Sequence, residues 1–251
     1  MKKAIKSLLI CGYLVLAGCG GGDKIVERRP LADMYAEAYK KIDAKNYDGA
    51  AEIFLDIETG YPADVWAADA LVMAAYVQYQ SGKFADALTT VDRFMRFHPG
   101  HADAAYMMYL RGMCFYRQVS DVRREPGMSA YALNAFNQLR QRFPDSDYAK
   151  NAGNKIVILK NYIAGKIMYS ARRDLARQNY TVAINNLQRV VTEMSETRMT
   201  AEALFRLVEA YEAIGLPEQA AGYSEMLRKN FPDGVWAKKL DKRAEKKEDD
   251  K

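Results

Sequence analysis

Three cysteines and two histidines are the side chains with the most chemistry to offer. His98 and His101 flank a Pro-Gly turn, and two imidazoles three residues apart could touch one metal ion. No third ligand stands near them in the sequence, so we interpret the pair as part of a turn and expect no metal site. Three cysteines without a Cys-x-x-Cys pair also exclude a disulfide framework.

Cys19 ends a short apolar stretch near the N-terminus. Lys2, Lys3 and Lys6 come before this stretch, which has roughly ten residues, whereas a membrane-spanning helix needs about 20. A basic start followed by a short apolar run is typical of a secretory signal. The residues Leu-Ala-Gly-Cys that end at Cys19 resemble the bacterial lipobox. That resemblance implies cleavage before Cys19, a diacylglycerol on its sulfur and an acyl chain such as palmitate on its amine.

The lipobox predicts how the mature protein begins. We expect residues 1–18 to be a signal peptide and residues 19–30 to be a lipidated flexible tether. Several acyl chains hold a protein firmly to a bilayer, where one chain binds only marginally. Gly20 stands after the cysteine in place of Asp, and by resemblance to enterobacterial sorting this favours the outer membrane. The alternative is an ordinary secreted protein whose signal contains a cysteine.

Sequence motifs for catalysis are absent. The chain has no Walker A loop, no GxGxxG before a helix, no HExxH and no GxSxG. Cys114 lies in an apolar helical stretch, so we interpret it as a core residue. Three of the five net positive charges belong to the signal, which leaves too small an excess to indicate nucleic acid. The sequence thus predicts no catalytic residue, no cofactor beyond the lipid on Cys19, and no nucleic-acid partner.

The elements that position the functional side chains are expected to be helices. Between residues 31 and 237 apolar residues recur at intervals of three and four, as in helices, and no segment alternates convincingly as a strand would. Five segments share one pattern. Each has an alanine, a residue that is usually larger four positions after it, and another seven positions after it, and then a turn. These positions fall on one helix face, where the small residue lets a neighbouring helix approach. The small residues are Ala50, Ala87, Ala132, Ala183 and Ala220.

This pattern resembles the tetratricopeptide repeat, a pair of antiparallel helices of about 34 residues. It implies an all-α fold, an α-solenoid of about five repeats that forms a curved superhelix; a generic helical bundle is the alternative. The third repeat holds an insert near residues 120–128, and the fourth begins with a long helix from about Tyr148 to Gln178 and has Ser195 where the others close with proline. We expect the repeats at residues 31–65, 66–101, 102–147, 148–199 and 200–237.

Two further features of the composition bear on binding. Tyrosines gather in the first helices of the first three repeats, which in such arrays line the concave side; a large apolar ring with a polar tip suits peptide capture. Most of them could equally belong to the core, so only Tyr35, Tyr79 and Tyr106 are taken as groove candidates.

Residues 238–251 form a charged tail that we expect to be disordered or a frayed helix.

Longer stretches resemble the BamD (ComL) family of the β-barrel assembly machine. They are residues 91–125, 143–168 and 201–216, and the most specific short piece is Tyr109-x-Arg111-Gly112. Together with the lipobox, the resemblance covers nearly the whole chain. It implies a non-enzymatic scaffold lipoprotein of a Gram-negative bacterium, anchored in the outer membrane and facing the periplasm.

The same resemblance implies the partners. The carboxy-terminal repeats would bind the POTRA repeats of BamA, the amino-terminal groove would receive unfolded outer-membrane proteins, and other assembly-machine lipoproteins would join. Because arginine pairs bidentately with carboxylates, the candidates for the BamA interface are Arg189, Arg198 and Arg206. The open alternative is a tetratricopeptide lipoprotein of pilus biogenesis or the cell envelope that binds a different periplasmic partner. The alternative from another class is an enzyme. Because the repeats occupy the rest of the mature chain, its catalytic domain would have to fit into the tether and the tail.

Overall fold

The computed structural model describes residues 29–119 and 127–249, which form eleven helices and no strand. The all-α prediction is therefore confirmed. Cys19, the signal peptide at 1–18, most of the tether and most of the expected insert lie outside the described residues and stay predictions. The helices are α1 (Leu31–Asp43), α2 (Tyr47–Gly60), α3 (Trp66–Gln80), α4 (Phe84–Phe97), α5 (Ala104–Tyr116), α6 (Gly127–Arg142), α7 (Asp147–Ala176), α8 (Tyr180–Glu193), α9 (Thr200–Ala213), α10 (Pro217–Asn230) and α11 (Val235–Asp249).

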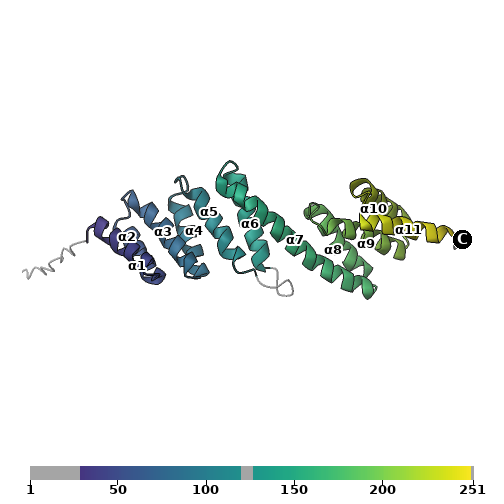
Figure 1. Cartoon of the computed structure of the whole chain (residues 1–251), viewed down its shortest axis with the longest axis horizontal. Coiled ribbons are helices and arrows are strands. Elements are labelled where there is room, and N and C mark those ends of the chain that lie inside the picture. The colour runs from purple at the N-terminus through teal and green to yellow at the C-terminus, as the bar shows by residue number, and fades with distance from the viewer. Residues whose placement is uncertain (1–28, 120–126, 250–251) are drawn as a thin grey trace, which may run out of the picture.

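The helices stand side by side in an elongated row, with α1 and α11 at opposite ends (Figure 1). The described residues form five core clusters, and each cluster is shared by three consecutive helices. The first helix of each later pair, α3, α5, α7 and α9, contributes to two clusters and so joins one pair to the next. A continuous core built only from neighbour contacts is the mark of a solenoid, as the repeat pattern predicts.

The five alanines of the repeat pattern are buried, Ala220 to 4% exposure and the others completely. An additional close approach occurs at Gly112 on α5, where the ring of Phe136 on α6 leaves no room for a side chain. Cys114 is also buried, and this burial raises the pKa of its thiol to about 12. This thiol is a core residue, as the apolar pattern around it predicts.

Within residues 29–119 and 127–249, four turns between paired helices contain a residue with positive φ, a conformation that ends a helix. Glycine adopts it without strain, whereas other residues do so at a cost of about 1–2 kcal/mol. These residues are Lys45 (57°), Gly82 (80°), Gln178 (63°) and Gly215 (76°).

The long helix α7 links the two ends of the row, with α1–α6 on one side and α8–α11 on the other (Figure 1). Its 30 residues confirm the expected long helix of the fourth repeat. Its amino-terminal part packs in a cluster with α5 and α6, and its carboxy-terminal part packs with α8 and α9. Among the described helices, none combines the length and the apolar character needed to cross a bilayer.

The charged tail is helical through Asp249 as part of α11. Ala237 and Leu240 are buried against α9 and α10, and the ring of Trp236 lies 5.2 Å from the ring of Phe205 on α9. Arg243 also binds α9, through Glu209 and Glu212 at 3.0 and 2.7 Å. The charge pattern predicts a disordered tail or a frayed helix. The first half of the tail is instead a packed helix, so this prediction is wrong there.

Candidate functional site

A hollow of about 650 Å³ lies at the amino-terminal end, between α1, α3 and the turn that precedes α5. Apolar and aromatic side chains make up most of its lining, and two carboxylates complete it. The repeat geometry creates it, because α1 and α3 are the first helices of successive pairs and share one face of the row. The lining residues are Leu31, Ala32, Tyr35, Tyr39, Trp66, Asp69, Val72, Met73 and Asp103.

Tyr35 is the groove candidate that lies in this hollow. Its hydroxyl donates to the main-chain oxygen of Trp66 at 2.9 Å, which ties α1 to the first turn of α3. The Tyr35 ring packs edge-on against Phe54 and Trp66, with centroid distances of 5.6 and 5.8 Å. Burial, followed by the nearby carboxylate of Asp69, raises the pKa of Tyr35, so the hydroxyl stays protonated. Tyr35 therefore builds the wall and is itself only partly accessible.

Tyr39 and Trp66 offer their rings more openly, at 48% and 52% exposure. Neither Tyr39 nor Trp66 is among the groove candidates predicted from the sequence. The spacing of Tyr35 and Tyr39, four apart on one helix face, is the signal that could have identified the second ring. Trp66 carries no such signal, because its ring partner Tyr35 lies 31 positions earlier in the sequence.

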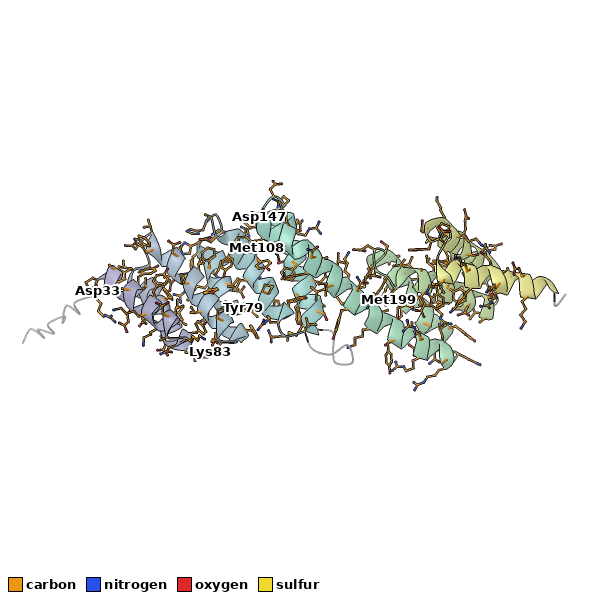
Figure 2. The ribbon with its side chains drawn as sticks, in the orientation of Figure 1. Asp33, Tyr79, Lys83, Met108, Asp147 and Met199 are labelled. Atoms are coloured by element: carbon orange, nitrogen blue, oxygen red, sulfur yellow. The ribbon has the colours of Figure 1, made fainter. Side chains whose placement is uncertain are left out.

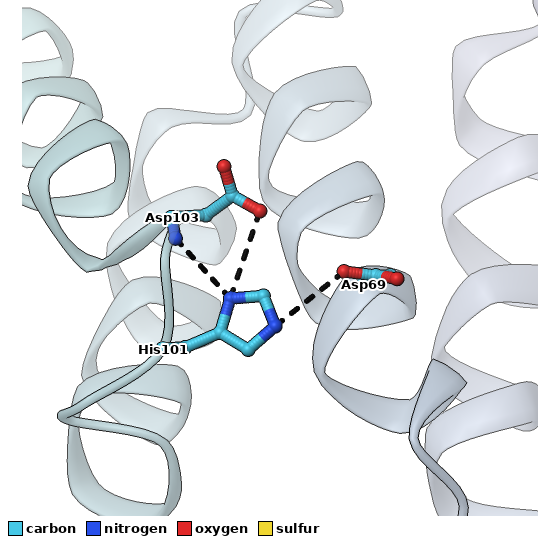
Figure 3. Close-up of side chains that lie close together, drawn as sticks. All are labelled: Asp69, His101 and Asp103. Carbon is cyan, nitrogen blue, oxygen red and sulfur yellow. Dashed lines mark hydrogen bonds and ion pairs between the residues drawn. The ribbon is translucent and has the colours of Figure 1, made fainter.

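Asp69 and Asp103 form the polar side of the hollow. Figure 3 shows these two carboxylates with the side chain of His101. The His101 ring lies between the two carboxylates, with Nε2 3.6 Å from Asp69 and Nδ1 3.6 Å from Asp103. The main-chain N–H of Asp103 donates to Nδ1 at 3.2 Å, so a neutral ring carries its proton on Nε2, toward Asp69. The imidazole thereby bridges α3 to the turn before α5.

This cluster differs from the pair considered in the sequence. His98 is not a member, and the third residue, Asp69, comes from a distant helix that local spacing cannot reveal. One ligand atom from each residue lies within 4.8 Å of the others, a spacing that a metal ion could bridge. Because each carboxylate faces a different ring nitrogen, we interpret His101 as a bridge, and the absence of a metal site stays a prediction.

Tyr79 on α3 and Tyr106 on α5 do not line the hollow (Tyr79 is labelled in Figure 2). Tyr106 lies 5.4 Å from the ring of Tyr148 on α7, and Tyr148 lies 5.5 Å from Tyr109. Burial, and then the neighbouring hydroxyls of Tyr148, Tyr76 and Tyr79, raise the pKa of Tyr106. Tyr79 and Tyr106 therefore belong to a second aromatic group, separate from Tyr35.

The three arginine candidates have three different environments. Arg189 pairs loosely with Glu193 one turn along α8, at 3.6 Å, and is half exposed. Arg198 is exposed in the turn between α8 and α9, where its main-chain N–H donates to Asn161 on α7. Arg206 on α9 contacts Glu209 at 2.7 Å and lies 5.5 Å from the ring of Trp236 on α11. The structure does not join them into one patch.

Arg206 belongs to a chain of ion pairs that crosses α7, α9 and α11. Arg172 on α7 donates twice to Glu202, at 2.8 and 2.5 Å, and Glu202 also faces Arg206. Glu209 then joins Arg206 to Arg243. Arg172, Arg206 and Arg243 line a hollow of about 480 Å³. The side chain of Arg206 thus helps to hold the last helices together.

Known proteins resemble this chain over most of its length. The family model YfiO, described as an outer membrane lipoprotein, matches residues 27–243. The chain is 34% identical to the outer membrane protein assembly factor BamD of Caulobacter vibrioides over 225 residues, covering 88% of this chain and 74% of that protein. It is 32% identical to the BamD of Rickettsia prowazekii over 239 residues, covering 94% of each. Among solved structures, the TPR domain of P58(IPK) is similar at a TM-score of 0.43 and 16% identity, over 82% of this chain and 52% of that one.

Proposed function

Because the chain belongs to the YfiO family of outer membrane lipoproteins, we propose that it is a non-enzymatic assembly factor for outer-membrane proteins. Relatives that carry the name BamD support this function over most of their length. The observation that carries it is the aromatic hollow between α1 and α3, with Tyr39 and Trp66 about half exposed. Such a surface binds polypeptide and needs no reacting group.

The hollow holds client polypeptide. An unfolded outer-membrane protein presents alternating apolar side chains, which bury apolar area against Tyr39, Trp66 and Met73. The second aromatic group around Tyr106 extends the binding face along α5. Only part of each ring is exposed, so the complex is weak and dissociates quickly, which suits a factor that passes its client on.

The carboxy-terminal helices bind the barrel component BamA. Arg189 and Arg198 are the exposed cations offered to its carboxylates. Arg206 contributes indirectly, since it holds Glu209 and the ring of Trp236 and thereby fixes α9 to α11. Other assembly-machine lipoproteins complete the complex, and acylated Cys19 holds the protein at the periplasmic face of the outer membrane.

Affinity purification of the full chain from detergent-solubilised membranes tests this function. BamA should be recovered with the chain, and a double variant with Arg189→Ala and Arg198→Ala should recover several-fold less of it. Arg140→Ala on α6 is the matched control and should leave recovery unchanged. Recovery of a secretin or a peptidoglycan enzyme without BamA would instead support a role in pilus biogenesis or the cell wall.

A further inference from the structure

The charges of the amino-terminal hollow are all of one sign. Two carboxylates, Asp69 and Asp103, line it, and among the described residues no lysine or arginine does. Each of these carboxylate side chains is 45% exposed, so both are accessible to a ligand. Their one ion-pair partner in the described part of the chain is His101, which balances at most one negative charge when protonated and none when neutral.

Other acidic groups add to this imbalance. Asp64, just before α3, accepts a hydrogen bond from the main-chain N–H of Trp66 at 3.0 Å. Burial contributes most to the raised pKa of Tyr35, and the negative charges of Asp69 and Asp64 raise it further. The polar side of the hollow therefore carries an excess of negative charge, and no lysine or arginine of the described part of the chain lines it.

The opposite walls are aromatic. Tyr35 lies 6.3 Å from Tyr39 and 5.8 Å from Trp66, measured between ring centroids. The face of an aromatic ring is electronegative and attracts a cation within about 6 Å. Val72 and Met73 add an apolar surface that suits the aliphatic stem of a long side chain. The hollow thus favours one kind of group, a cation on a flexible apolar stem. The carboxylates and the ring faces attract the cation, and the apolar surface contacts the stem.

We propose that this hollow binds a lysine or arginine side chain of an unfolded polypeptide, next to apolar residues of the same segment. The inference deepens the proposed client-binding function and rests on it. The cationic head meets Asp69 and Asp103, and the stem lies against the apolar wall. A chain end bearing a free carboxylate is disfavoured here, because it would meet two like charges. The hollow therefore selects a basic internal position of the client.

Fluorescence anisotropy with three peptides tests the selection. The full chain in detergent is titrated with labelled, end-blocked Val-Thr-Lys-Leu-Thr-Phe and with two copies in which norleucine or glutamate replaces the lysine. Norleucine keeps most of the stem and removes the charge. The lysine peptide should bind about tenfold more tightly than the norleucine peptide, and the glutamate peptide should bind most weakly, since a cation–π contact and partly exposed ion pairs together supply about that factor.

Protein variants locate the effect. Asp69→Asn and Asp103→Asn keep the shape of the side chains, and each should bring the affinity for the lysine peptide toward that of the norleucine peptide. Asp33→Asn, an exposed residue of α1 outside the lining, is the matched control and should change neither affinity. The peptide series leaves the protein unaltered, so it decides the question even if a variant fails to fold.

The outcomes separate this inference from the function on which it rests. Equal binding of the lysine and norleucine peptides would show that the hollow holds apolar segments without selecting a cation, which overturns the inference and leaves the proposed function standing. No binding of any peptide would overturn both. A lysine preference that Asp69→Asn and Asp103→Asn leave intact, with both variants folded, would place the selective site elsewhere and contradict the assignment.

Discussion

A Cβ atom built on Gly112 of α5 would lie 2.3 Å from the ring of Phe136 on α6. Real carbon contacts are about 3.5–4.0 Å, so the two helices can pack at this distance only because residue 112 has no side chain. Phe136 is completely buried and cannot swing away. This contact gives a packing reason for the glycine in the Tyr109-x-Arg111-Gly112 piece.

Gly112→Ala should therefore destabilise the fold. Overpacking typically costs about 1–3 kcal/mol, and the overlap with three atoms of a buried ring points to the upper part of that range, above the gain of about 1 kcal/mol from replacing a helical glycine by alanine. Gly153→Ala on α7 is the matched control, because nothing lies within 4 Å of its added Cβ, and it should raise the melting temperature or leave it unchanged. Thermal unfolding by circular dichroism measures both, and equal behaviour of the two variants would refute the close contact.

The pair between Arg172 and Glu202 predicts an acid-sensitive contact between α7 and α9. Burial alone raises the pKa of Glu202, but the charges and hydrogen bonds of Arg172 and Arg206 outweigh it and lower the pKa below its usual 4.5. A carboxylate with a lowered folded pKa stabilises the fold fully above its unfolded pKa, and this stabilisation is lost as the pH falls through the folded value. The loss therefore begins below about pH 4.5.

Glu202→Gln measures that contribution. At pH 7 the variant should melt a few degrees below the natural chain, and the difference should shrink as the pH falls below 4.5. Glu225→Gln, an exposed position on α10, should melt in parallel with the natural chain at every pH. A constant difference for Glu202→Gln across the same range would contradict the assigned ion pair.

The docking of α11 predicts a local effect for Trp236→Ala. The Trp236 ring contacts Phe205 and lies beneath the guanidinium of Arg206, so its loss removes the main aromatic contact that holds α11 to α9. Amide hydrogen exchange in α11 should become about tenfold faster, while exchange in α1–α5 stays the same, because a solenoid transmits contacts only between neighbours. Faster exchange along the whole row would show that the chain unfolds as one unit.

The lipid anchor predicts the behaviour of Cys19→Ser. Without the thiol no diacylglycerol can attach, so radioactive palmitate labelling and pelleting with membranes should both be lost. Cys114→Ser, which changes a buried thiol, should keep both properties. A Cys19→Ser chain that still incorporates lipid would refute the assignment.

Sequence reasoning predicts the fold because the repeat signal is local. Ala50 and its counterparts lie on one helix face, and their spacing alone identifies buried positions. The order of the tail is missed because its many charges hide the apolar Leu240, which packs against α9 and α10, and because Trp236, two residues before the tail, adds a contact to α9. Composition averages over the segment, whereas docking depends on the few residues of one face.

The candidate site is predicted only in part, because it is assembled from separate helices. Tyr35, a groove candidate, lines a hollow, and its role in binding stays a prediction. The Asp69–His101 contact joins residues 32 positions apart, which no local pattern shows. Arg206 is the reverse case. Glu202 and Glu209 stand four and three positions from it on α9, a spacing that already indicates ion pairs within the chain.

Crosslinking in cells from position 39 tests the central claim most directly. A photoreactive phenylalanine at Tyr39 should trap newly made outer-membrane proteins, identified by mass, while the same group at Tyr169 should not, although this tyrosine on α7 is more exposed, at 65% against 48%. If Tyr39 traps no client, or if Tyr169 traps the same clients to the same extent, the hollow between α1 and α3 is not where this chain holds polypeptide.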